Sequence, residues 1–250
     1  MALPLDAAKV RALLLDIEGT TTPVDFVLKT LFPFANSHVQ DFLRRHFQEA
    51  EIETLVAQLR EASDRDVADG APSCTPAVGQ ENISSAAAYV RWLMARDSKI
   101  TPLKTLQGKI WAEGFLTGRL KGELYPDVAA AFARWKAQGR RLAIFSSGSV
   151  LAQKLLFAHS TSGDLSSFLD AYFDTEIGPK REAESYRKIA AAIELQPGAI
   201  LFVSDVGEEL DAAKAAGMNT VHSLRPGVPR LQDGRHFAIR DFDEIFSSDG

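Results

Sequence analysis

Short apolar runs that do not alternate with polar residues recur along this chain and constrain its fold more than any other feature. They occupy residues 11–16, 141–146 and 199–204, and weaker runs follow at 219–223 and 236–240. Each run is too short for a helix, and the lack of alternation is typical of strands that are buried on both faces. The sequence therefore predicts a parallel sheet.

Helical patterns separate these predicted strands. Residues 128–139 and 182–194 carry apolar side chains at helical spacing, and residues 208–217 are rich in alanine. The first and third of these stretches close on a glycine, which is suited to end a helix. Because strands alternate with helices, we predict an α/β fold with a doubly wound parallel sheet.

The segment from residue 21 to residue 120 interrupts this alternation. It lies between the first and second predicted strands and contains helical patterns but no convincing strand. These patterns cover residues 30–47, 52–62, 84–96 and 103–115. We therefore predict an α/β catalytic core made of residues 1–20 and 121–250, with residues 21–120 inserted as a helical cap.

Charge and composition narrow the class of partner. The formal net charge is −5, whereas nucleic-acid and membrane-surface partners usually require a basic face. Residues 1–10 lack a signal-peptide pattern, and no apolar run approaches the roughly 20 residues that span a membrane. The single cysteine, Cys74, lies in a predicted loop at 69–80 and excludes an intrachain disulfide. We expect a cytoplasmic protein with no nucleic-acid and no membrane partner.

Acidic residues follow two of the predicted strands. Asp16 and Glu18 stand two residues apart, so they can face the same side, and Asp205 follows the run at 199–204. Ligands of open α/β sheets bind at the carboxyl ends of the strands. There one carboxylate can attack phosphorus while another handles protons, and Mg²⁺ takes carboxylate and phosphate oxygens. Asp16, Glu18 and Asp205 are therefore candidate metal ligands, and Gly19 allows a close backbone approach.

Two further features suit a phosphate group. Ser146 and Ser147 stand between a predicted strand and a helix, where hydroxyls and free amides bind phosphate oxygens, although serine is also a favoured helix N-cap. Lys180 follows a Gly-Pro pair at a predicted helix start, where the helix dipole disfavours a cation unless an anion lies nearby. Arg181 competes for the same role. Together with the acids, these residues predict a phosphate site.

The ordered set of motifs resembles the haloacid dehalogenase superfamily. Most of its members carry Asp as the second acid, and the departure at Glu18 makes the chain similar to the enolase-phosphatases of methionine salvage. The matching motifs cover nearly the whole chain and are Asp-Ile-Glu-Gly-Thr-Thr-Thr at 16–22, Leu-Phe-Pro-Phe-Ala at 31–35, Leu-Gln-Gly-Lys-Ile-Trp-Ala-Glu-Gly-Phe at 106–115, Tyr-Pro-Asp-Val at 125–128, Phe-Ser-Ser-Gly-Ser-Val-Leu-Ala-Gln-Lys at 145–154 and Asp-Thr-Glu-Ile-Gly-Pro-Lys at 174–180.

This resemblance implies a monomeric, magnesium-dependent phosphoric monoester hydrolase with one Mg²⁺ per subunit. Its small-molecule substrate would be 2,3-diketo-5-methylthiopentyl-1-phosphate, which is enolised and then dephosphorylated to the acireductone 1,2-dihydroxy-3-keto-5-methylthiopentene. Carried over to the matching positions, the resemblance makes Asp16 the phosphorylated nucleophile. Ser146 and Ser147 would hold phosphate oxygens, and Lys180 would balance the charge on Asp16 and the phosphoryl group.

The role of residue 18 stays open at this point. Glu18 would protonate the leaving oxygen and later activate water, but a carboxylate that ligates Mg²⁺ is held ionised. Either its backbone is the ligand or the two roles are sequential. The base for enolisation is unassigned, and Asp25, His38 and His46 are candidates in the predicted cap.

Other functions fit these motifs less well. The alternative within the superfamily is a phosphatase or phosphomutase that acts on another small phosphate ester. Signalling receiver domains also place acids and a lysine on a doubly wound sheet, but they are shorter and lack an inserted cap. No Gly-x-Gly-x-x-Gly motif follows a predicted strand, which counts against a dinucleotide-binding module.

Overall fold

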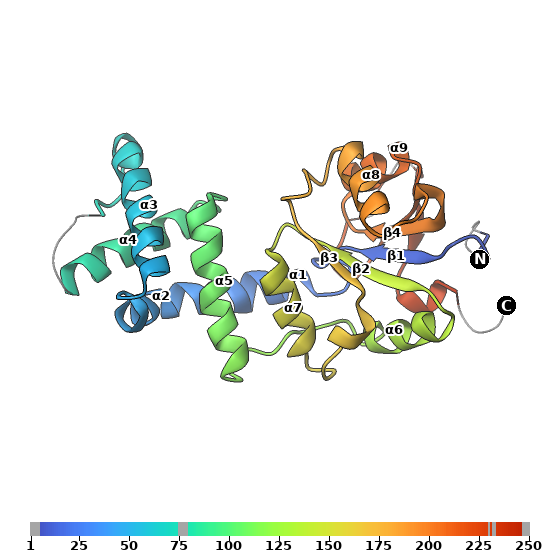
Figure 1. Cartoon of the computed structure of the whole chain (residues 1–250), viewed down its shortest axis with the longest axis horizontal. Helices are drawn as coiled ribbons and strands as arrows, with labels where there is room; N and C mark the ends of the chain where they lie inside the picture. Colours follow the sequence, from blue (N-terminus) through green and yellow to red (C-terminus); the bar gives the residue numbers. More distant parts are fainter. Residues whose placement is uncertain (1–5, 75–79, 230, 232–233, 247–250) are drawn as a thin grey trace. The chain divides into compact units, whose positions relative to one another are not determined.

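The computed structural model of the chain describes residues 6–74, 80–229, 231 and 234–246. These residues form two compact units (Figure 1). One unit comprises Met1–Val24 and Lys121–Gly250, and the other comprises Asp25–Leu120. Residues 75–79 of the predicted loop at 69–80 lie outside the described residues, whereas Cys74 is buried.

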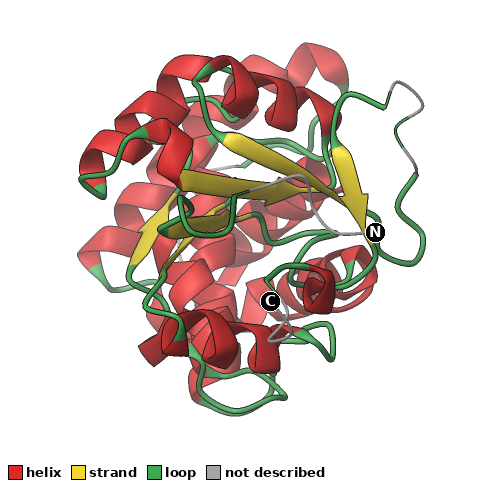
Figure 2. Ribbon diagram, turned by 90° about the vertical axis from the view of Figure 1, so that its right-hand side faces the viewer, coloured by secondary structure: helices red, strands yellow, loops and turns green. Residues whose placement is uncertain are grey.

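The first unit is built on a single twisted sheet (Figure 2). Its strands are parallel and lie in the order β3-β2-β1-β4-β5-β6. The strands are β1 (Ala12–Leu15), β2 (Arg141–Phe145), β3 (Ala171–Phe173), β4 (Ile200–Ser204), β5 (Asn219–Ser223) and β6 (Phe237–Ile239). The predicted parallel sheet is confirmed, and every apolar run contains one of these strands. Strand β3 was not predicted.

Helices cover both faces of this sheet, which confirms the α/β fold. Helices α8 (Ala183–Ala192) and α9 (Gly207–Ala215) pack against one face, and α6 (Val128–Ala137) and α7 (Val150–Ala158) lie on the opposite side (Figure 1). All four residues of β1 are fully buried, as are Ile200 to Val203 in β4. Burial on both faces explains why these strands have continuous apolar runs rather than alternating ones.

The second unit contains helices joined by turns and loops, and no strand among its described residues. Its long helices are α2 (Phe32–His46), α3 (Ala50–Asp66), α4 (Gln80–Ala95) and α5 (Thr101–Leu116), and short turns α1 (Val24–Phe26) and η1 (Val27–Leu31) precede them. Each of the four long helices overlaps one predicted helical pattern. Helix α2 buries Ala35, Val39, Phe42 and Leu43, a spacing that places them on one face toward the other helices.

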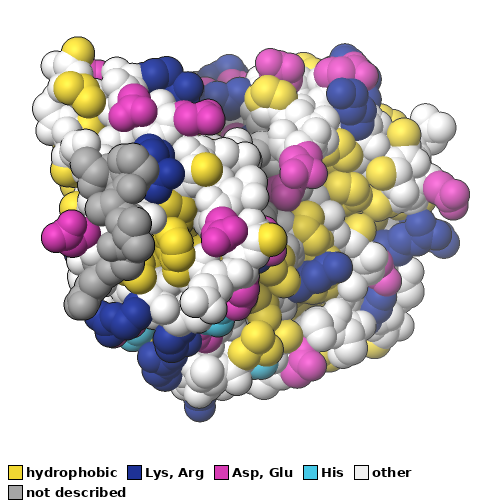
Figure 3. All heavy atoms as spheres, turned by 60° about the vertical axis from the view of Figure 1, so that its left-hand side comes forward, with side chains coloured by type: hydrophobic (Ala, Val, Ile, Leu, Met, Phe, Trp, Pro, Cys, Tyr) yellow, Lys and Arg dark blue, Asp and Glu magenta, His cyan; other side chains and the backbone are white. Residues whose placement is uncertain are grey.

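One face of the molecule carries charges of both signs (Figure 3). On the face shown in Figure 3, basic and acidic side chains are interspersed and separated by smaller hydrophobic groups. This mixing avoids a large field of one sign on that face. Across the described residues, no helix has both the length and the apolar character needed to cross a membrane.

Candidate active site

The order of the strands gathers the polar residues predicted from the sequence at one edge of the sheet. Strand β1 lies between β2 and β4, and Leu15 pairs with Ile144 on one side and with Val203 on the other. Asp16, Ser146 and Asp205 each follow directly from one of these three strands. Because the strands are parallel and in register, their next residues emerge side by side.

Asp16 lies at the centre of this edge and is almost fully buried, with 4% of its surface exposed. Its Oδ1 accepts hydrogen bonds from Lys180 Nζ at 2.7 Å and from Ile17 N at 2.8 Å. Its Oδ2 accepts a hydrogen bond from Ser204 Oγ at 3.3 Å. These contacts fix the orientation of the carboxylate.

Lys180 is the cation that the structure brings to this carboxylate, whereas Arg181 is exposed. Its Nζ also contacts Glu209 Oε2 at 2.7 Å. Burial alone would lower the pKa of Lys180, but the negative charges of Asp16 and Glu209 outweigh burial and raise it. Lys180 is therefore a fixed positive charge.

Helix α8 holds the backbone around Lys180. Tyr186 Oη donates a hydrogen bond to the carbonyl oxygen of Lys180 at 2.7 Å, and Ser185 Oγ donates one to that of Pro179 at 2.7 Å. Tyr186 is itself fully buried between sheet and helix. The position of the ammonium group is thus set by the core and not by a free loop.

Glu209 is a site residue that is absent from the candidates predicted from the sequence. It lies in the first turn of α9 and accepts a hydrogen bond from Ser204 Oγ at 3.1 Å. Burial, and then the charge of Asp16, raise its pKa to about 7. Its place one turn after Asp205 was the available signal, because that turn faces the strand ends.

Asp205 and Gly19 approach each other closely. Gly19 has a φ of +67°, and a Cβ atom at this position would lie 2.2 Å from Asp205 Oδ2. Burial, followed by the charge of Asp16 and a smaller contribution from Glu18, raises the pKa of Asp205 to about 7. Asp16, Asp205 and Glu209 therefore carry more negative charge than the single ammonium group of Lys180 can balance.

Oxygen donors with excess negative charge suit a hard cation such as Mg²⁺. The side chains do not form a complete cage: among the described residues, no group of three or more His, Cys, Asp or Glu has the arrangement of a metal site. Mg²⁺ commonly takes one or two carboxylates and completes its octahedron with water and substrate oxygens. The pair Asp16 and Asp205 fits this pattern.

The serine motif separates into two functions. Ser149 is the N-cap of α7, where its Oγ accepts a hydrogen bond from Ala152 N at 3.3 Å. Ser146 is buried at the end of β2 and its Oγ accepts a hydrogen bond from Gly148 N at 3.3 Å, while Ser147 is exposed. Since the cap is Ser149, the hydroxyls of Ser146 and Ser147 are not used for capping.

The three candidate bases in the helical unit have partners within it. Asp25 forms an exposed ion pair with Lys29 at 2.7 Å. His38 stacks on Phe34, and its Nδ1 lies 2.8 Å from the carbonyl oxygen of that residue. His46 contacts Glu49 and Glu113, at 2.6 and 3.2 Å. These contacts do not distinguish one of the three residues as the base for enolisation.

Comparisons with known proteins agree with this geometry. Residues 10–217 match the family model of haloacid dehalogenase-like hydrolases. The enolase-phosphatase E1 of Synechococcus elongatus is 49% identical over 98% of this chain and 100% of its own length, and that of Drosophila melanogaster is 43% identical over 89% and 86%. Among solved structures, the UTR4 protein of Saccharomyces cerevisiae has a TM-score of 0.75 and 32% identity, covering 94% of this chain and all of that one.

Proposed function

Since this chain belongs to the enolase-phosphatase family of haloacid dehalogenase-like hydrolases, we propose that it enolises 2,3-diketo-5-methylthiopentyl-1-phosphate and then dephosphorylates it. The product is the acireductone 1,2-dihydroxy-3-keto-5-methylthiopentene of methionine salvage. The observation that carries this proposal is the buried ion pair between Asp16 and Lys180, 2.7 Å apart at the carboxyl end of the central strand. A buried, oriented carboxylate beside a fixed ammonium group suits attack on a phosphate ester.

In the proposed phosphatase step, a carboxylate oxygen of Asp16 attacks phosphorus and the bond from phosphorus to the ester oxygen breaks. Glu18 gives its proton to that oxygen. Glu18 then takes a proton from water, the water oxygen attacks phosphorus, and inorganic phosphate leaves with Asp16 restored. The exposure of Glu18, in contrast to buried Asp16, suits a group that exchanges protons with water.

The remaining residues of the site hold charge and phosphate oxygens. We assign phosphate oxygens to Ser146 and Ser147, and the charge of the phosphoryl group to Lys180. One Mg²⁺ per subunit, held by Asp16, Asp205 and residue 18, would supply Lewis-acid stabilisation of the phosphoryl charge when bound. Residue 18 would bind through its backbone carbonyl group, because a carboxylate that ligates Mg²⁺ is held ionised and could not also donate the proton.

The same charges serve the enolisation step. Removal of a proton beside a carbonyl requires that the carbonyl be polarised, and Lys180 or the bound cation supplies the positive charge. We further propose that residues 21–120 are a helical cap inserted into the catalytic core of residues 1–20 and 121–250. The enzyme would act as a cytoplasmic monomer, without a nucleic-acid or membrane partner.

The test is release of inorganic phosphate from the diketo phosphate, with Mg²⁺ and with a chelator. Asp16→Asn is compared with wild type, and Asp243→Asn, an exposed aspartate of the same unit, is the matched control. We expect magnesium-dependent release that is lost only in Asp16→Asn. Release from sugar phosphates alone would refute the substrate, and equal turnover by Asp16→Asn would refute the nucleophile.

A further inference from the structure

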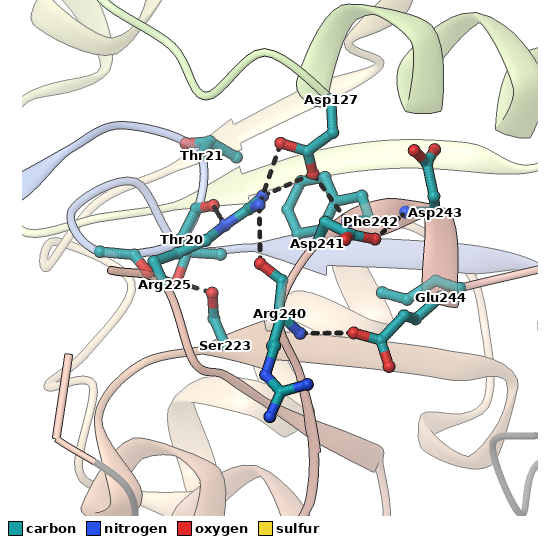
Figure 4. Close-up of polar contacts among 12 residues, drawn as sticks. Thr20, Thr21, Asp127, Ser223, Arg225, Arg240, Asp241, Phe242, Asp243 and Glu244 are labelled. Carbon is teal, nitrogen blue, oxygen red and sulfur yellow. Dashed lines mark hydrogen bonds and ion pairs between the residues drawn. The ribbon is translucent and has the colours of Figure 1, made fainter. Parts of the chain in front are cut away.

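The loop that follows Asp16 is held through three consecutive carbonyl oxygens, and Figure 4 shows the bonds that Ser223 and Arg225 donate to two of them. The three hydrogen bonds are Ser223 Oγ to Gly19 O at 3.0 Å, Arg225 Nε to Thr20 O at 3.1 Å, and Tyr125 N to Thr21 O at 3.0 Å. The donors come from the end of β5, from the segment after it and from the segment before α6. Two separate parts of the chain, residues 223–225 and the segment before α6, therefore fix one short piece of backbone.

Arg225 is the charged member of this set and is buried, with 3% of its side chain exposed. Its Nη1 and Nη2 form a two-pronged ion pair with Asp127, at 2.9 Å to Oδ1 and 2.8 Å to Oδ2. Nη1 also donates a hydrogen bond to the carbonyl oxygen of Arg240 at 3.2 Å. This orientation leaves Nε directed at Thr20, and a planar guanidinium group is suited to make all these bonds at once.

The surroundings of Arg225 prevent the guanidinium group from turning. Its Cζ lies 4.4 Å from the ring centroid of Tyr125 and 4.6 Å from that of Phe242. Asp127 is fixed in turn, because its Oδ2 accepts a hydrogen bond from Phe242 N at 2.6 Å (Figure 4). Contacts outside the loop therefore hold both Arg225 and Asp127 in place.

A buried ion pair is weak evidence for stability, because desolvation of both charges offsets most of their attraction. The location of this pair suggests another use. Within the loop, the amides of Thr20, Thr21 and Thr22 all donate to the carbonyl oxygen of Ile17, and Gly19 N donates to Thr22 O. The amide groups of the loop therefore bond within the loop, whereas the carbonyl groups of Gly19, Thr20 and Thr21 accept hydrogen bonds from residues outside it.

We propose that Arg225, oriented by Asp127, is a positioning residue for the phosphatase site. By holding Thr20, it keeps Glu18 at the end of β1 and keeps Gly19 against the carboxylate of Asp205. This inference rests on the proposed function, since it concerns the loop that is proposed to carry the nucleophile and the acid. A displacement of about 1 Å at such a site costs about 100-fold in rate.

The test compares Arg225→Lys with Arg134→Lys. Lysine keeps the charge but loses the planar group that bonds Asp127 and Thr20 together. Arg134 is a suitable control because it lies in the same unit, pairs with Asp243 at 3.1 Å and donates a hydrogen bond to Phe242 O at 2.7 Å. Each variant thus disturbs one arginine–aspartate pair that contacts Phe242.

Two readouts are measured well below the unfolding temperature of each variant. The first is hydrogen exchange of the amides of residues 19–22, and the second is kcat and KM for phosphate release. We expect Arg225→Lys to speed exchange of these amides at least about tenfold. We also expect it to lower kcat by about 10- to 100-fold at nearly constant KM, while Arg134→Lys changes neither readout.

Equal exchange rates and equal kcat values in the two lysine variants would overturn the positioning role. If Arg225→Lys does not fold, Asp127→Asn replaces it, because asparagine keeps the size of the side chain and frees the guanidinium group. The same changes are then expected, with smaller amplitude. If wild type releases no phosphate, the proposed function is wrong, and the exchange rates of the loop amides still decide the positioning role.

Discussion

Replacing Asp205 by asparagine should stabilise the metal-free protein while it removes the activity. Burial and the charge of Asp16 raise the pKa of Asp205 from its usual 3.8 to about 7. The folded state therefore holds this proton more tightly than the unfolded chain does. Wild type loses stability as the pH rises from the lower value to the higher one, and the loss is complete above both.

The size of this effect follows from the shift. Three pKa units correspond to about 4 kcal/mol. Because the carboxylate keeps partial access to solvent, roughly half of that is expected, or about 2 kcal/mol. For a domain of this size 1 kcal/mol moves the unfolding temperature by about 2–4 °C. Asp205→Asn should therefore unfold roughly 4–8 °C higher than wild type at pH 8 with a chelator present.

The assay is thermal unfolding at pH 8 and pH 5 in EDTA, followed by circular dichroism. At pH 5 the gain should be smaller, since wild-type Asp205 is then mostly protonated in the folded state. Asp243→Asn is the control, because this aspartate has a side-chain exposure of 67% and forms a surface ion pair. The reasoning fails if Asp205→Asn is no more stable than wild type at pH 8, or if its gain is the same at both pH values.

Three further changes test other parts of the site. Gly19→Ala adds a Cβ that meets Asp205 at a positive φ, so phosphate release should fall by more than about tenfold; Gly139→Ala, also at positive φ but with open space, should leave it unchanged. Glu209→Gln removes one charge that raises the pKa of Lys180, so the alkaline limb of the kcat–pH profile should move to lower pH, and an unmoved limb would contradict this. Burial raises the pKa of the Cys74 thiol, so a thiol reagent should label native protein far more slowly than unfolded protein; equal rates would show that Cys74 is accessible.

The sequence was most informative where a strand is buried on both faces. The runs at 11–16, 141–146 and 199–204 became the three adjacent strands β1, β2 and β4, because burial leaves no room for polar residues. Strand β3 escaped prediction for the opposite reason. It has only three residues, Ala-Tyr-Phe, all half-buried, and it is the outermost strand beside β2, so its apolar run is too short to predict a strand.

Polar residues near a strand end could be found in the same way, but their partners could not. Asp16, Ser146 and Asp205 follow predicted strands, so their convergence was expected once the sheet was parallel. Lys180 and Glu209 meet only through the packing of α8 and α9 on the sheet. No local spacing encodes that contact, which depends on the three-dimensional arrangement of the core.

The contrast between Lys180 and Arg225 explains how the carboxyl ends of the strands can be both reactive and rigid. Lys180 faces several carboxylates, so the negative charge around it exceeds its own, which suits the cation and the phosphate that are proposed to bind there. Arg225 is matched by Asp127, so it adds hydrogen bonds to the loop without adding net charge. An unpaired arginine there would place a positive charge behind Thr20 and weaken cation binding in front of it. Because Asp127 neutralises Arg225, the arginine can hold the loop without changing the net charge of the site.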